Sequence, residues 1–285
     1  MEVGIGLALA AALLTNLASL LKHRGCQSAD PVSIRRPLRT VRRLATSRWF
    51  AAGWALAAVA WLVHVAALSM APISLVQAVL AGGAVSLAVM SQTLFGDRVE
   101  RRQWLALLLG ASGLALLVLT VPRFGGSHSS FSIAAMLGFE GGLALIAAGL
   151  VTGHRSERLA GHGGVLLAAI AGILFAIAGV AIKGITGAAG LSVAVLAPWA
   201  LTTLIAGIFA QYAAAAALQR GDAVETIGLM GLVANAAQIA GGVLVFGDPL
   251  SGHPLGLALQ TMAFAMVCLS ALLLPAPKSA VPLPA

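Results

Sequence analysis

Hydrophobic residues in this chain form long runs rather than short alternating stretches. A membrane-spanning helix needs about 20 apolar residues with few charges. Transmembrane β-strands are only about 10 residues long and alternate polar with apolar positions. The pattern therefore predicts an all-α polytopic membrane protein with nine transmembrane helices. Their expected limits are residues 3–21, 49–69, 73–95, 103–121, 131–152, 163–183, 198–218, 223–246 and 254–275.

Composition and charge support a membrane location and indicate lipid as a partner. The chain is 60% hydrophobic and 9% charged, and its net charge is +8. Eight of the seventeen basic residues lie in the loop 22–48, which has almost no aromatic residues for stacking on nucleic-acid bases. Basic clusters between spans normally meet anionic lipid headgroups, so we expect lipid binding and no nucleic acid. The expected lipid-binding residues are Arg35, Arg36, Arg39, Arg42 and Arg43.

The distribution of basic residues also predicts the orientation. Cytoplasmic loops are enriched in Lys and Arg. If the loop 22–48 is inside, fifteen basic residues lie on that side, and only Arg123 and Lys183 lie on the other. We therefore expect a multi-pass protein of the plasma or inner membrane, with its N-terminus outside and its C-terminus inside.

The two halves of the chain repeat one another. A shift of 150 residues sets Trp49 on Trp199, and a shift of 151 sets the Phe-Gly-Asp at 95–97 on the same tripeptide at 246–248. A weaker match sets Lys22 on Lys183. The predicted organisation is a first repeat with spans 1–4, a central fifth span with its loops, a second repeat with spans 6–9, and a disordered tail. Their limits are 1–121, 122–162, 163–275 and 276–285.

Equivalent spans are five apart, and because five is odd, the second repeat must cross the membrane in the opposite direction. Residues 97 and 248 should then lie at opposite faces, each in a Gly-Asp pair suited to ending a helix and turning the chain. Inverted repeats are a recurring way to build transporters with a site near the bilayer midplane.

Four segments carry a family resemblance: LALAAALLTNLASLLKHRG at 7–25, APISLVQAVLAGGAVSLAV at 71–89 leading into FGDRVERRQW, AGILFAIAGVAIKG at 171–184, and QYAAAAALQRGDAVETIGLMGLV at 211–233. In these segments the chain resembles the drug/metabolite transporter (DMT, EamA-like) superfamily, and more closely its NIPA-like magnesium transporter branch. The resemblance covers most of residues 3–275. It implies a secondary transporter by alternating access, with Mg²⁺ or another divalent cation as substrate.

The resemblance breaks at the position that matters most for a cation. In NIPA-like proteins the second span carries an acidic residue followed three positions later by Asn. Here those positions hold Trp61 and His64. The carboxylate that the family would offer to a cation is therefore missing.

Glu140 is the one carboxylate expected deep in the bilayer. An ionisable group there is a functional candidate by default, because burying it in hydrocarbon costs several kcal/mol unless it is paired or faces a cavity. We expect a translocation or metal-binding role for Glu140. The alternative is a structural Glu packed at the face formed by Gly138, Gly141 and Gly142.

Other polar residues within the spans are candidates for a solute path. Asn235 and Gln238 are three residues apart and share a helix face. They either line a path or join helices by hydrogen bonds. His64 either titrates in a vestibule or is bonded to a neighbouring helix. The remaining translocation candidates are Gln211, Gln77 and Asn16.

Three further charged features have simpler interpretations. Asp222 followed by Glu225 is a capping-box arrangement. Lys22 and Lys183 lie at span ends, where long side chains extend toward headgroups. A role for Lys183 in binding an anionic substrate remains open.

These patterns favour a secondary transporter of a small solute or cation. An exporter of a small organic metabolite or drug is the first alternative, and a non-transporting scaffold or lipid-tethered regulator is the second. We expect no enzyme, since no cluster of His, Asp or Glu and no nucleophile with its base lies near a membrane face. No cofactor is expected, and a homodimer is left open.

Overall fold

A computed structural model of the chain describes residues 2–29, 31–32, 37–120, 131–154, 163–186, 193–248 and 250–273. Every regular element among them is a helix: α1 Glu2–Gln27, α2 Pro37–Thr46, α3 Arg48–Met70, α4 Ile73–Gly82, α5 Ala84–Met90, the π-helical turn η1 Ser91–Phe95, α6 Arg101–Thr120, α7 Ile133–His154, α8 Gly163–Thr186, α9 Val193–Leu218, α10 Ala223–Phe246 and α11 Pro254–Leu273. The all-α prediction is confirmed for the described residues. Arg35, Arg36 and the tail 276–285 lie outside them.

Seven helical stretches in the described part of the chain are long and apolar enough to cross a membrane. They are α1, α3, the stretch Ile73–Phe95 that joins α4 to η1, α7, α8, α9 and α10. The chain is accordingly a polytopic membrane protein. The remaining two expected spans correspond to α6 and α11, so the total of nine spans stays a prediction.

Two expected boundaries were wrong, and the third span keeps its expected limits 73–95 but contains an interruption. α1 continues to Gln27, and the loop 22–48 contains the helix α2. The seventh run was expected to start at Pro198, but α9 starts at Val193 and includes that proline. The third span is interrupted at Gly83, which lies between α4 and α5.

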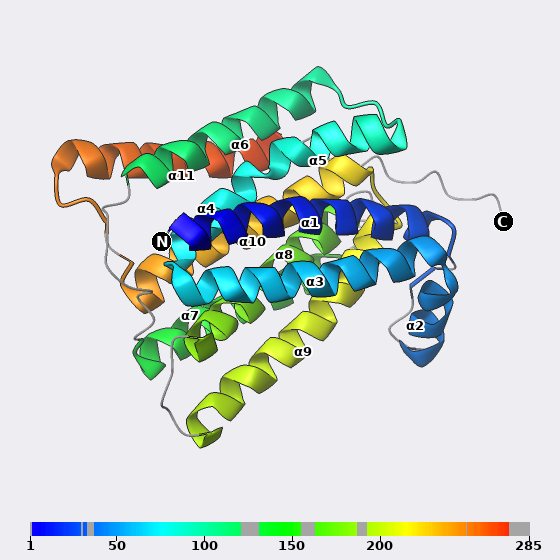
Figure 1. The fold of residues 1–285 in the computed structure, drawn as a ribbon. Coiled ribbons are helices and arrows are strands. Elements are labelled where there is room, and N and C mark those ends of the chain that lie inside the picture. The colour runs from blue at the N-terminus through cyan, green and yellow to red at the C-terminus, as the bar shows by residue number, and fades with distance from the viewer. Residues whose placement is uncertain are drawn as a thin grey trace.

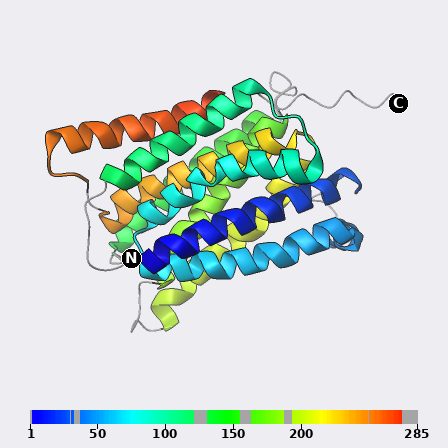
Figure 2. The ribbon, with the colours of Figure 1, turned by 45° about the horizontal axis from the view of Figure 1, so that its top comes forward.

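Helices that match by the sequence repeat run in opposite directions. Figure 1 shows α3 running from right to left and α9 from left to right, while α4 and α5 run opposite to α10, and α6 opposite to α11. α1 packs along α3, and α8 packs along α9. α6 lies beside α11 in both ribbon views (Figures 1 and 2). These directions are the ones that an inverted repeat requires.

Both Phe-Gly-Asp strings end a helix in the same way. Gly96 and Gly247 have positive φ angles of 72° and 65°, a conformation that glycine adopts without steric cost. The N–H of Asp97 donates to Ser91 O, and that of Asp248 donates to Gly242 O, each six residues back. The N–H of Gly96 and that of Gly247 donate to the same two carbonyls, so both helices end at a left-handed glycine, which is a common C-cap residue.

The two aspartates differ in what their side chains bind. Asp97 accepts a hydrogen bond from Ser91 Oγ on its own helix. Asp248 is buried and accepts one from the backbone N–H of Ser74, in the first turn of α4, at 3.0 Å. The residue before α4 is Pro72, which has no capping side chain, so Asp248 caps this helix from another part of the chain. Asp222, which precedes α10 as Pro72 precedes α4, caps its own helix, as predicted.

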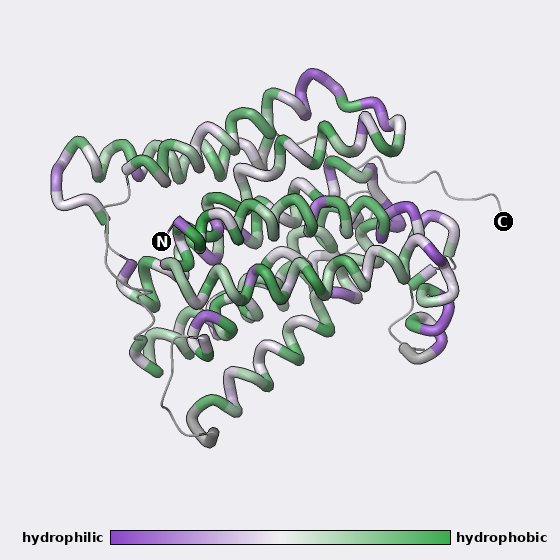
Figure 3. Tube along the Cα trace, in the orientation of Figure 1, coloured by the Kyte–Doolittle hydropathy of each residue, from purple (hydrophilic) through white to green (hydrophobic). Residues whose placement is uncertain are grey.

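Hydrophilic positions are most frequent at one end of the bundle, although a few lie at the other end. Figure 3 shows them around α2 and at the connection between α5 and α6, while the helices themselves are mostly apolar. Arg39, Arg42 and Arg43 on α2 are exposed. This distribution agrees with the predicted cytoplasmic side but does not establish it, so lipid binding by these residues and the orientation remain predictions.

The opposite directions of the halves predict where labels will react. Arg98 and Gly252 are exposed neighbours of the two Phe-Gly-Asp strings. In a chain with Cys26 and Cys268 replaced by serine, we expect Arg98→Cys and Gly252→Cys to react with a membrane-impermeant maleimide from opposite sides of sealed vesicles. Reaction of both from one side would contradict the inverted repeat.

The different partners of the two aspartates predict different stability effects. Asp248→Ala leaves the buried N–H of Ser74 without an acceptor and should lower the free energy of unfolding by about 1–3 kcal/mol. Asp97→Ala, at the equivalent but half-buried position, should cost about 1 kcal/mol or less. Unfolding midpoints of both variants in detergent test this order. Equal losses would show that the cap on α4 contributes little.

Candidate functional site

A large cavity lies within the helix bundle, between the two sequence repeats. Its volume is about 800 Å³, and its walls come from α1, α2, α3, α4, α8, α9 and α10. The lining is mostly apolar, with a small number of polar side chains. This is the usual character of sites for small organic molecules.

Six of the seven predicted translocation residues line this cavity: Asn16, His64, Gln77, Gln211, Asn235 and Gln238. They come from α1, α3, α4, α9 and α10, so residues far apart in the sequence converge on one space.

The seventh, Glu140, does not line the cavity within the described residues. Its side chain is buried on α7, and Oε1 has no hydrogen-bond partner in the described chain. A Cβ built at Gly138, Gly141 or Gly142 would have no described heavy atom within 4 Å, so no described helix packs closely on these glycines, and the structural alternative for Glu140 also stays a prediction. The predicted metal role of Glu140 remains untested, and no group of three or more His, Cys, Asp or Glu in the described residues could hold a metal ion.

The two buried glutamines join the halves across the cavity. Gln77 Nε2 donates to Gln238 Oε1 at 2.9 Å, and Gln238 Nε2 donates to Ala234 O at 3.3 Å. His64 Nε2 lies 3.5 Å from Gln77 Nε2. His64 Nδ1 and Gln77 Oε1 have no hydrogen-bond partner among the described residues. Gln238, one of the two amides predicted to line a path or to join helices, thus joins helices and lines the cavity, while its part in a solute path stays a prediction.

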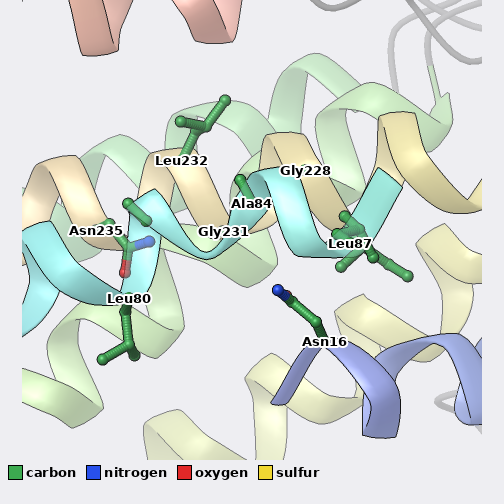
Figure 4. Close-up of a pocket in the computed structure, with 10 residues that line it drawn as sticks. Asn16, Leu80, Ala84, Leu87, Gly228, Gly231, Leu232 and Asn235 are labelled. Carbon is green, nitrogen blue, oxygen red and sulfur yellow. The ribbon is translucent and has the colours of Figure 1, made fainter. Parts of the chain in front are cut away.

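Asn16 holds the interruption in the third span. Its Nδ2 donates to Gly83 O at 2.7 Å and to Ser86 Oγ at 3.0 Å. Figure 4 shows Asn16 reaching from α1 toward α5, with Asn235 on the side of α10. A side chain at Gly83 would collide with Ala12, since its Cβ would lie 2.7 Å from Ala12 Cβ. Glycine at this position thus allows α1 to approach the break.

At the end of the bundle opposite Lys22 and α2, Lys183 forms a buried clamp on the end of α3. Lys183 is fully buried, and its Nζ donates to Leu68 O at 2.7 Å and Ala71 O at 2.8 Å, the carbonyls at the end of α3. Asp248 interacts electrostatically with Lys183. The expectation that Lys183 extends toward headgroups was wrong, because the helix-end carbonyls bind it inside the protein.

Aromatic residues pack against one another beside this clamp. Phe131 packs edge-to-face against Trp199 and Phe246, with ring centroids 5.8 Å and 5.9 Å apart. Leu68 and Ala71, whose carbonyls bind Lys183, belong to the same apolar cluster. Such pairs contribute packing energy beyond the apolar area they bury.

Lys22 is a site residue that the sequence interpretation missed. It was expected to extend toward headgroups, but it is 8% exposed and lines the cavity. A signal was present, because Asn16, Ser19 and Lys22 recur every three residues and so share one helix face. All three line the cavity.

No protein-family model, curated protein or solved structure matches this chain. The resemblance to the drug/metabolite transporter superfamily and its NIPA-like branch therefore stays an expectation from the sequence.

A glycine pair offers a matched test of the contact between Gln77 and Gln238. A Cβ at Gly179 would overlap the side-chain amide of Gln238, whereas one at Gly207, which lines the same cavity, would meet no described atom. Gly179→Ala should displace Gln238 from Gln77 and lower the free energy of unfolding by about 1–3 kcal/mol. Gly207→Ala should change it by about 0.5 kcal/mol or less. Unfolding midpoints in detergent measure both, and similar values for the two variants would contradict the prediction.

Proposed function

We propose that the protein is a membrane transporter that moves a small solute by alternating access. The observation that carries the proposal is the convergence of six polar side chains on a cavity inside an apolar helix bundle. The six residues come from both sequence repeats, as a site between two moving halves requires. A secondary transporter of the drug/metabolite type is the class that we infer, in the plasma or inner membrane.

We infer that the cavity opens at one end and is closed at the other. It extends from Gln77 and Gln238 to Lys22 and to Leu44 on α2, the end that we predict to be cytoplasmic. At the opposite end, Lys183 and Asp248 hold the turn between α3 and α4. We infer an inward-facing state whose outer gate is this clamp.

The chemistry of the cavity favours an organic solute over Mg²⁺. Mg²⁺ prefers octahedral oxygen ligands and is usually held through one or two carboxylates. No Asp or Glu is among the described lining residues, whereas Lys22 adds a positive charge. The magnesium activity implied by the resemblance thus has no carboxylate in the cavity to support it.

Labelling of one cysteine in the cavity tests alternating access without knowledge of the substrate. Gly207 has room for a side chain, so Gly207→Cys in a chain without Cys26 and Cys268 should leave the fold intact. We expect an impermeant maleimide to react with it from either face of sealed vesicles, because the two states expose the cavity in turn. Lys183→Met, which removes the clamp, should increase the rate of labelling from the predicted outer face. Labelling from one face alone, with or without Lys183→Met, would favour a static scaffold.

A further inference from the structure

Comparison of the two repeats shows that Lys22 and Lys183 have different roles. Lys183 binds the carbonyls of Leu68 and Ala71, at the end of α3. The repeat sets Leu68 on Leu218 and Ala71 on Gly221, at the end of α9. If the halves were identical, Lys22 would bind these last two carbonyls.

Other side chains occupy those carbonyls instead. Gln27 Nε2 donates to Leu218 O at 3.0 Å, and His23 Nε2 lies 3.2 Å from Gly221 O. Lys22 makes no hydrogen bond or ion pair with any other described residue. Gln27 and His23 thus occupy the carbonyls at the end of α9, as Lys183 does at the end of α3. The ammonium of Lys22 is available to a ligand in the cavity.

The position of Lys22 is set by packing. A Cβ at Gly53 would lie 2.8 Å from Lys22 Cγ and 2.9 Å from Lys22 N, so glycine makes room for the lysine stem between α1 and α3. Within the described chain the buried ammonium of Lys22 has an electrostatic interaction with the Cys26 thiol but no hydrogen-bond acceptor, and a buried ammonium is costly unless an acceptor satisfies it. The cavity that Lys22 lines is where such an acceptor can bind.

The surroundings of Lys22 select the rest of the ligand. Phe50, Trp54, Trp61, Phe175 and Tyr212 line the same cavity and provide apolar, aromatic walls. α2 forms part of the lining through Val41 and Leu44 and carries exposed arginines without an acidic residue. A positive entrance raises the local concentration of anions.

We propose that Lys22 binds the acid group of a small amphipathic organic anion, whose apolar body occupies the aromatic part of the cavity. This inference names the substrate class of the proposed transporter and rests on that function. The same chemistry is found in an anionic phospholipid, so the experiment must separate a water-soluble acid from a lipid headgroup.

Three indole compounds of similar size and different charge serve as probes: indole-3-acetate, the neutral indole-3-acetamide and the cationic tryptamine. Their binding is measured by scintillation proximity on the full chain in phosphatidylcholine nanodiscs. A charge-assisted hydrogen bond predicts that the acid binds about tenfold to a hundredfold more tightly than the amide, and the amine most weakly. Equal binding of acid and amide, or preference for the amine, would overturn the proposal.

Variants assign the preference to Lys22. Lys22→Met keeps an unbranched side chain beside Gly53 and should abolish the preference for the acid, so that acid and amide bind about equally. Lys22→Arg keeps the charge and should retain the preference. If Lys22→Met still prefers the acid, another group binds it and the proposal fails. If Lys22→Met does not fold, the order of the three probes on the unmodified chain still decides.

Lipid composition separates the two sources of the anion. Phosphatidylglycerol added to the nanodiscs should leave acid binding within about twofold. A loss of about tenfold or more would mean that a lipid headgroup occupies the site and would overturn a soluble anion as the ligand.

The outcomes for Lys22 and for alternating access can be told apart. If the acid binds through Lys22 but Gly207→Cys reacts from one face alone, the binding site is supported and the transporter proposal fails. Reaction from both faces without preference for the acid rejects the role of Lys22 alone.

Discussion

The absence of water in the hydrocarbon core is the constraint on which this structure depends. Every polar group within the spans must find a partner inside the protein or face a cavity. Gln77, Gln238 and Lys183 have partners on other helices. Asn235, Gln211 and Lys22 form no hydrogen bond with other described residues, and all three line the cavity. The presence or absence of a hydrogen-bond partner therefore distinguishes the polar groups that hold the helices together from those that are available to a solute.

The repeat places the same physical problem at equivalent positions, and the two halves solve it with different residues. The carbonyls that end α3 bind one lysine, whereas those that end α9 lie against a glutamine and a histidine. The first turn of α10 is capped by the residue before it, and that of α4 by Asp248 from the other half. A duplicated framework can thus keep its shape while single residues become available for a new purpose.

Much of the fold could be predicted because apolar runs of membrane-spanning length leave few alternatives. The polar positions within those runs also predicted six of the polar side chains that line the cavity, since an amide in hydrocarbon needs a partner or a water-filled space. Glu140 does not lie with them, because its place was inferred from counting along the span, which says nothing about the direction of a side chain around its helix. The prediction that Lys22 extends toward headgroups was wrong for a different reason. It was based on the position of Lys22 near a helix end, but packing beside Gly53 directs the side chain inward.

The break at Gly83 has a mechanical consequence. Gly83 O accepts bonds from Ser86 N, Ser86 Oγ and Asn16 Nδ2, so the i→i+3 bond and side chains replace the regular ladder at this point. A short stretch of this geometry within a helix often marks a hinge. α4, before Gly83, is hydrogen-bonded to the other half of the chain through Gln77. α5, after Gly83, leads to the π-helical turn η1. Gly83 is therefore the position at which the two parts of the third span, α4 and α5, are best able to change their angle.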